Sequence, residues 1–337
     1  ADADVILVGD IDRGGVFASL YGSVMLQTPE DRQRIKGIII NKFRGDLRLF
    51  EDGRRMIEEL CQVPVLGVVP YLEDIGVEDE DSVVLDKKQR SAKDDKVNVA
   101  VVKLRHLSNF TDFNAIEQDN RLNVYYTTEK EQLLRADIII LPGCKATIDD
   151  LRHLKEEGVA DTIREAHRQG KTIFGICGGY QMLGMSIDDP RQTEGDVIHI
   201  EGIGLLPMRT VMGERKITCQ TEFTLATNSN DMCKDGVKMR GYEIHQGIST
   251  PIDKSTYKPL TIKADGTPDG CIADSHCMGT YLHGCLDNAA MVDYLIGKKN
   301  TESFDFAEYK EQHYNRLADH IRKHVDMAKV YDILSRQ

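Results

Sequence analysis

The sequence lacks two features that would direct the protein to a membrane or to nucleic acid. It has no apolar run close to the ~20 residues that a membrane-spanning helix needs. It also has no excess of positive charge, because 43 Lys and Arg face 55 Asp and Glu, for a net charge of -12. That charge argues against nucleic acid and anionic lipid as partners.

The cysteines lack the spacing of a disulfide framework. A chain of 337 residues with eight cysteines does not resemble a small secreted fold that disulfides hold together. We therefore expect reduced thiols and a cytoplasmic protein.

The phosphate-binding motif G-x-x-x-x-G-K-[ST] is also missing from the sequence. Any nucleotide domain in this chain is therefore without its phosphate loop. The chain enters an apolar strand, Val5 to Val8, almost at once. We expect either a domain that starts with a strand or a fragment whose upstream part was removed.

The first 90 residues show the alternation of an α/β domain. The apolar segments "VILVGD", "IKGIIIN" and "PVLGVVP" alternate with amphipathic helical segments. This pattern predicts a parallel sheet with both faces covered. In such sheets ligands bind at the carboxyl ends of the strands, where the polar loops "DIDRGG" and "NKFRGD" fall.

The residues of these two loops allow two readings. Asp10, Asp12 and Arg13 suit contacts with phosphate or metal, and the Asn41 amide could read the edge of a base. Alternatively, the glycines only allow tight turns, and the charged side chains only face solvent. Both readings stay open at this point.

A highly charged stretch near residues 73–96 predicts an exposed connection between two domains. We expect a second domain over residues 96–300 and a C-terminal helical extension over residues 301–337. No internal repeat is visible.

The second domain contains the stretch "FGICGGYQMLG", which predicts a nucleophile. A strand, Cys177, two glycines and a helix in that order form a nucleophile elbow, in which a sharp turn raises the thiol above the sheet. The N-terminus of the helix favours the thiolate. The N–H of Gly178 and the loop around Gly143 would supply an oxyanion hole. The alternative is a structural cysteine beside a tight turn.

A thiolate nucleophile needs a base. His283 in "GTYLHG" is the first candidate, and His245 in "GYEIHQG" is the rival. A cluster of cysteines and histidines near the C-terminal end of this domain could also form a metal site. Its members are Cys271, His276, Cys277, His283 and Cys285. The cluster lacks the C-x2-C pair of a structural zinc site, so we expect no metal.

These motifs resemble a known family. "GICGGYQMLG" followed by "GTYLHG" resembles the class I glutamine amidotransferases, which have a flavodoxin-like domain. Further motifs narrow the resemblance to the cobyric acid synthase family of cobalamin biosynthesis, over nearly the whole chain. They are "LVGDIDRGGVFASLYG", "GIIINKFRGD", "PVLGVVPYL", "SNFTDFNAIE", "LPGCKATIDDL" and "GYEIHQG".

The resemblance implies a longer protein. Family members carry an upstream phosphate-binding loop in a P-loop domain of the dethiobiotin-synthetase type. By this comparison the chain is an N-terminally truncated fragment: the rest of an ATP-binding domain and a whole glutaminase domain. Asn41 would then contact adenine, and Asp10, Asp12 and Arg13 would lie near the phosphates or the corrinoid.

The resemblance also implies an activity. The family amidates the b, d, e and g carboxylates of adenosylcobyrinic acid a,c-diamide with glutamine and ATP-Mg. Cys177 would attack the glutamine amide, and His283 would act as general base and acid. Gly143, Gly178, Gly179 and Gln181 would form the oxyanion hole and the glutamine pocket.

The sequence departs from the expected pattern in two places. In the loop "LPGCKAT", Cys144 and Ala146 stand where the resemblance leads us to expect Ser and Asn. Many class I enzymes carry a Glu two residues after the His, where this chain has Cys285, so a Cys–His dyad is expected. Glu243 and His245 match the family in a secondary role. The alternatives are cobyrinic acid a,c-diamide synthase, a cell-wall amidotransferase and a non-catalytic binding module.

Overall fold

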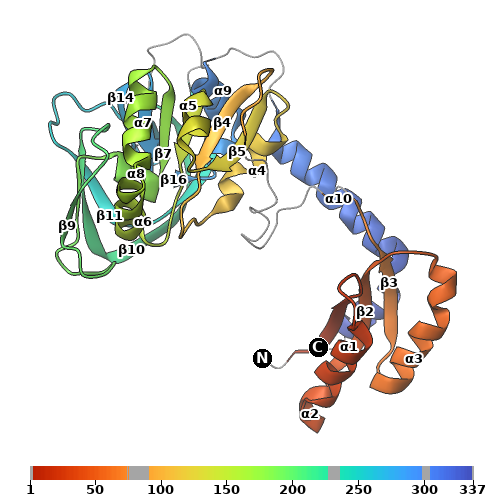
Figure 1. Cartoon of the computed structure of the whole chain (residues 1–337). Helices are drawn as coiled ribbons and strands as arrows, with labels where there is room; N and C mark the ends of the chain where they lie inside the picture. Colours follow the sequence, from red (N-terminus) through yellow and green to blue (C-terminus); the bar gives the residue numbers. More distant parts are fainter. Residues whose placement is uncertain (1–2, 74, 76–90, 227–235, 298–303, 336–337) are drawn as a thin grey trace. The chain divides into compact units, whose positions relative to one another are not determined.

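The computed structural model describes residues 3–73, 75, 91–226, 236–297 and 304–335. Contacts divide the chain into two units (Figure 1). The first comprises residues 1–77 and 308–337, and the second comprises residues 78–307. Across the described ranges, none of the helices combines the length and apolarity that crossing a bilayer requires.

The first unit contains a parallel sheet in the order β1-β2-β3. Its β-branched residues suit a strand with both faces covered. Helices α1 and α3 cover one face, where Leu20 and Ile57 pack on Ile38 and Ile40. The elements are β1 (Val5–Asp10), α1 (Val16–Met25), α2 (Pro29–Arg32), β2 (Ile35–Phe43), the 3-10 turn η1 (Leu47–Phe50), α3 (Glu51–Cys61) and β3 (Val65–Pro70).

The C-terminal segment consists of α10 (Phe306–His324) and α11 (Met327–Ser335). Met327 and Val330 of α11 pack on the other face of this sheet. Val325, between the two helices, packs on Leu66 and Val69 of β3, and it pairs with Gly67 in an isolated bridge. Val325 is therefore part of the core of the first unit, with residues of α11 packed against it.

The second unit is built on a six-stranded sheet in the order β14-β15-β7-β6-β4-β5. All neighbours are parallel except β14 and β15. This agrees with the predicted flavodoxin-like α/β domain. The strands are β4 (Val97–Val102), β5 (Leu122–Thr127), β6 (Ile138–Leu141), β7 (Thr172–Ile176), β14 (Cys271–Asp274) and β15 (Cys277–Thr280).

Helices lie on both faces of this sheet. Because successive side chains of a strand point to opposite faces, neighbouring residues of β6 pack against different helices. Ile139 of β6 packs with Leu151 and Ile163 on one face, whereas Ile140 packs with Met291 on the other. The helices and 3-10 turns are η3 (Phe110–Phe113), α4 (Asn114–Gln118), α5 (Lys130–Arg135), α6 (Thr147–Glu156), α7 (Val159–Arg168), α8 (Gly178–Leu183), η4 (Cys285–Asp287) and α9 (Ala289–Ile296).

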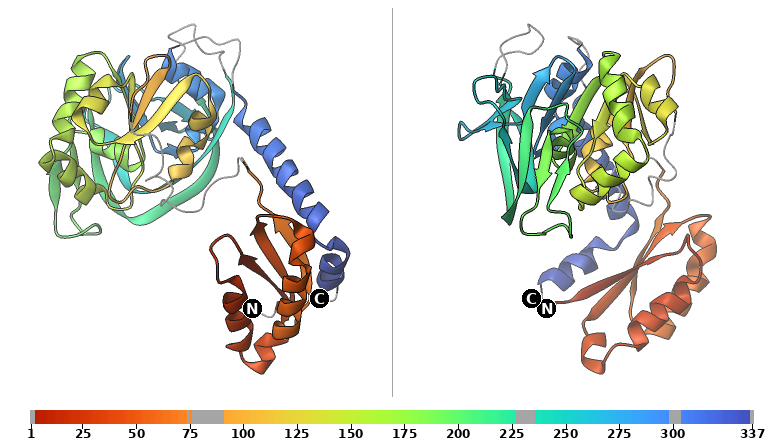
Figure 2. Two further views of the ribbon diagram at one scale, coloured as in Figure 1. Left: turned by 45° about the vertical axis from the view of Figure 1, so that its right-hand side comes forward. Right: turned by 60° about the vertical axis from the view of Figure 1, so that its left-hand side comes forward.

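A second, mostly antiparallel sheet belongs to the same unit, and the sequence analysis did not predict it. Figure 2 shows its long, curved strands β10 and β11. Its strands are β8 (Ser186–Asp188), β9 (His199–Glu201), β10 (Met208–Leu225), β11 (Met239–Pro251), β12 (Thr261–Lys263), β13 (Pro268–Asp269) and β16 (Leu282–His283). Because β16 pairs with β11, this sheet fixes the position of His283.

Candidate active site

Cys177 lies on a sharp turn between β7 and α8. Its φ of 50° and ψ of −108° are rare for a residue with a side chain, as in a strained nucleophile elbow. Two glycines make the turn possible. A Cβ on Gly175 would lie 2.7 Å from Tyr180 Cα, and one on Gly179 would overlap the Leu141 carbonyl.

His283 lies against the elbow, although it is distant in sequence. A Cβ on Gly143 would come within 2.8 Å of His283 Cε1 and 3.7 Å of Cys177 Cβ. Gly143 therefore touches both residues, and a larger residue there would push into the imidazole. The His283 ring also stacks on Tyr242 of β11, with ring centroids 5.2 Å apart.

A carboxylate that the sequence analysis did not select holds His283. Asp112 of η3 accepts a hydrogen bond from His283 Nδ1 at 2.7 Å and another from the Gly284 N–H at 2.8 Å. The side chains of His283 and Asp112 are only 1% and 2% exposed. The Asn109 amide lies 3.0–3.1 Å from both ring nitrogens.

The surroundings favour the charged form of His283. Burial alone lowers the pKa of the imidazole, but the Asp112 carboxylate and the Cys177 sulfur outweigh it and raise the pKa to about 10. At neutral pH the imidazolium is therefore the dominant form beside the thiol.

Cys285, at the position where many class I enzymes carry Glu, does not hold the histidine in this way. Its thiol is buried, and burial raises its pKa far above the ordinary value. The carboxylate beside His283 comes instead from residue 112.

A pocket of about 320 Å³ opens above Cys177. Of the residues predicted from sequence, Cys177, His283, Gly178, Gln181 and His245 line it, whereas Gly143 and Gly179 do not. Residues that the sequence analysis did not select also line it, and they include Asn109, Cys144, Lys145, Thr147, Glu194 and Lys216.

Gln181 presents an unused acceptor to this pocket. The side chain is 3% exposed, and its Nε2 donates to the Tyr281 hydroxyl at 3.3 Å. Its Oε1 is buried and has no hydrogen-bond partner among the described residues. A buried amide oxygen without a partner is costly, so it marks a place for a ligand donor.

Glu194 lies in the same pocket, near the start of α6. Its carboxylate accepts from the Thr147 hydroxyl at 3.3 Å and from the Ile148 N–H at 3.0 Å. Burial raises the pKa of the Glu194 carboxyl. With Lys145 and Lys216, it gives the pocket charges of both signs.

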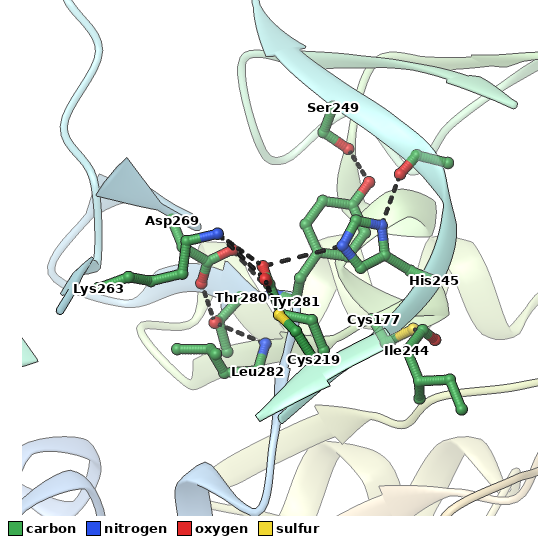
Figure 3. A network of polar contacts seen from close by, with 12 residues as sticks. Cys177, Cys219, Ile244, His245, Ser249, Lys263, Asp269, Thr280, Tyr281 and Leu282 are labelled. Atoms are coloured by element: carbon green, nitrogen blue, oxygen red, sulfur yellow. Dashed lines mark hydrogen bonds and ion pairs between the residues drawn. The ribbon is translucent and has the colours of Figure 1, made fainter. Parts of the chain in front are cut away.

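Glu243 and His245 belong to a polar network beside the pocket, of which Figure 3 labels His245, Lys263 and Cys219. Glu243 accepts from Lys263 Nζ at 3.0 Å and from the Cys219 thiol at 3.3 Å. His245, 3.8 Å away, and Lys263 lower the pKa of Glu243 to about 2. The carboxylate of Glu243 is therefore already paired within the protein.

His245 lines the pocket without facing the thiol as His283 does. Its ring stacks on Tyr281 at a centroid distance of 3.8 Å, and its Nδ1 lies 2.8 Å from the Gly247 carbonyl. The Cys177 thiol donates to the Ile244 carbonyl at 3.6 Å, as Figure 3 shows. Of the two candidate bases, His283 has the stronger geometric support.

In the first unit the two predicted loops meet at the strand ends. Asp10 and Asn41 are direct partners in the ladder of β1 and β2. Asp10 accepts from Lys42 Nζ at 2.8 Å, which lowers the pKa of Asp10, and Asp12 accepts from Arg44 Nε at 2.7 Å. The sequence analysis did not select the two cations. Arg13 is 3.7 Å from Asp10 and largely exposed.

The described residues hold no cluster of three or more His, Cys, Asp or Glu side chains suited to a metal ion. The cysteines whose placement is described are all free thiols.

Comparisons with known proteins match both units. The model of the CobB/CobQ-like glutamine amidotransferase domain matches residues 98–291, and an AAA domain model matches residues 1–79. The chain is 52% identical over 340 residues to the cobyric acid synthase of Phocaeicola vulgatus. It is 53% identical over 339 residues to that of Bacteroides fragilis.

Both alignments cover 99% of this chain and 67% of the relative. A more distant cobyric acid synthase, from Alkaliphilus metalliredigens, is 42% identical over 352 residues. The chain belongs to the cobyric acid synthase family.

Proposed function

We propose that this chain hydrolyses glutamine for the ATP-dependent amidation that converts adenosylcobyrinic acid a,c-diamide to cobyric acid in the cytoplasm. The ammonia amidates the b, d, e and g carboxylates of the corrinoid. One observation carries the proposal: a strained Cys177 lies against the buried, charged His283 in a polar pocket. Membership of the cobyric acid synthase family supplies the substrate.

The chemistry starts from a thiolate and an imidazolium. Cys177 Sγ attacks the carbon of the glutamine side-chain amide, and the C=O electron pair moves to oxygen. The N–H of Gly178, at the first position of α8, has no partner within the helix and lines the pocket, so it is available to that oxyanion. The Gly143 loop lies against both Cys177 and His283 and could supply a second donor.

His283 then moves the protons. It gives a proton to the amide nitrogen as the C–N bond breaks, so that ammonia leaves and a γ-glutamyl thioester remains on Cys177. The neutral imidazole next takes a proton from water as its oxygen attacks the thioester. Breaking the C–S bond restores the thiolate and releases glutamate.

Charged and polar groups of the pocket match the head of glutamine. Its α-ammonium needs acceptors, and Gln181 Oε1 and the Glu194 carboxylate supply them. Its α-carboxylate needs cations, which Lys145 and Lys216 supply. We assign recognition of the substrate to these four residues.

The strand ends of the first unit fit only part of an ATP site. The Asn41 side chain has an amide group for a base, although its Oδ1 already accepts from the Lys42 N–H at 2.9 Å. Asp10 and Asp12 are paired with Lys42 and Arg44, and the printed sequence contains no glycine-rich phosphate loop. ATP, when bound, supplies the phosphoryl group that makes a substrate carboxylate reactive. These residues alone do not account for its phosphates or for magnesium.

Labelling with a diazo-ketone analogue of glutamine, followed by intact mass spectrometry, tests the proposal. We expect one adduct on Cys177, blocked by excess glutamine and absent from Cys177→Ser. Cys144→Ser is the matched control, because Cys144 lines the same pocket, and it should still be labelled. Equal labelling of Cys177→Ser, or no effect of glutamine, would contradict the proposal.

A further inference from the structure

We infer that Asp112 is a positioning residue for catalysis: it fixes the orientation of the His283 imidazole and keeps a proton on its Nδ1. This role completes a Cys177–His283–Asp112 triad from a part of the chain far from the position that many class I enzymes use. The inference rests on the proposed glutaminase function.

The two carboxylate oxygens of Asp112 accept hydrogen bonds from two neighbouring residues, His283 and Gly284. Oδ2 accepts from His283 Nδ1, and Oδ1 accepts from the N–H of Gly284, the next residue in the chain. The imidazole is therefore fixed relative to its own backbone. With Tyr242 stacked on the ring, rotation of the side chain is restricted.

When the ring is neutral, the same contact selects its tautomer. A carboxylate only accepts hydrogen bonds, so the proton on the near side of the ring must be on Nδ1. Nε2 is then the atom that exchanges a proton with the thiol and with the leaving ammonia. In metal sites and in known catalytic triads a carboxylate orients histidine in the same way.

Burial strengthens this effect. Asp112 and His283 are both almost fully enclosed, so water screens their interaction little. A buried imidazolium without a carboxylate would lose its proton. Asp112 therefore keeps a proton available beside Cys177 at neutral pH.

A structural role alone is the competing explanation, because Asp112 also anchors the turn at Gly284. Asp112→Asn separates the two roles. The Asn oxygen can still accept from the Gly284 N–H. Its NH₂ group, however, faces Nδ1 and favours the tautomer with the proton on Nε2, and the negative charge is lost.

The first readout is alkylation of Cys177 by a haloacetamide as a function of pH, on the full chain. This reaction reports the thiolate and needs no glutamine turnover. We expect Asp112→Asn to shift the alkylation profile to higher pH by about one unit or more. We also expect kcat for glutamine hydrolysis to fall on the order of 10²–10⁴-fold, with a smaller change in KM.

Two further variants complete the design. Asp119→Asn removes another buried carboxylate, one that pairs with Arg121, and should leave the profile and kcat unchanged. Asp112→Glu keeps the charge but moves it, so its kcat should lie between those of wild type and Asp112→Asn. An intermediate kcat would mean that the conservative variant partly restores the activity that Asp112→Asn loses.

The outcomes are separable. A folded Asp112→Asn with wild-type pH profile and kcat would overturn the inference. If Asp112→Asn does not fold, Asp112→Glu decides: wild-type kcat would overturn the inference, and a loss of about tenfold or more would support it. In a further outcome, the wild-type chain hydrolyses no glutamine while Asp112→Asn still shifts the alkylation profile. That result would refute the proposed function and leave the Asp112–His283 coupling standing.

Discussion

At the scale of single residues, the proposed nucleophile and base could be selected from the sequence, but the carboxylate beside the base could not. The order of strand, cysteine, glycines and helix is a local signal, so Cys177 could be selected from eleven letters. Asp112 has no such signal. It lies between two phenylalanines in "NFTDFN", and only the fold brings it 2.7 Å from His283.

The ion pair of His283 predicts a pH dependence of stability. Its pKa in the folded chain, about 10, is above the ordinary value of 6.5, so folding favours the protonated ring. The stabilisation is fully present below pH 6.5 and is lost as the pH rises through about 10. We expect the stability difference between wild type and His283→Gln to shrink across this window, as measured by urea unfolding.

The other groups that titrate at high pH are present in both proteins. Their effects on stability therefore cancel in the difference between wild type and His283→Gln. A difference that stays constant, or grows, between neutral pH and pH about 10 would contradict the assigned charge state.

At the scale of elements, the parallel strands were predictable and the antiparallel sheet was not. Buried parallel strands such as "IIIL" of β6 are continuous apolar runs, which are visible in sequence. The hairpin of β10 and β11 has long exposed stretches, and its register is set by pairing across the two strands. Such pairing has no short-range signature.

The missed sheet matters for the site. Met239–Pro251 of β11 carries Glu243 and His245, and it pairs with the short strand that carries His283. The polar lining of the pocket is thus shared between the parallel sheet, which supplies Cys177, and the antiparallel sheet. Sequence motifs identified the residues individually, but they did not show how the two sheets bring them together.

At the scale of the whole molecule, the sequence suggested a C-terminal extension, and the structure makes it part of the first unit. The contact at Gly67 is tight, because a Cβ there would lie 2.8 Å from Val325 Cα and would also overlap the His324 carbonyl. No local pattern near either residue reveals a contact between segments so far apart in sequence.

The contact yields a prediction for the variant Gly67→Val. The added side chain should separate α11 from β3 and destabilise the first unit by about 1–3 kcal/mol. Limited proteolysis should then cut the C-terminal helices faster. Glutamine hydrolysis, which the second unit carries, should be retained.

Gly22→Ala is the matched control, because a Cβ at Gly22 in α1 meets no atom within 4 Å. It should leave proteolysis unchanged or slow it, since alanine favours a helix. Equal cleavage of Gly67→Val and wild type would show that the C-terminal helices do not depend on this packing.

The central claim is that Cys177 takes the γ-glutamyl group from glutamine while the Asp112–His283 pair handles the protons. Rapid acid quenching of the full chain with glutamine, followed by intact mass spectrometry and peptide mapping, tests it most directly. The account predicts a γ-glutamyl thioester on Cys177 that accumulates less in Asp112→Asn and is absent from Cys177→Ser. Glutamine hydrolysis that proceeds in Cys177→Ser, or a γ-glutamyl group on another residue, would contradict the account.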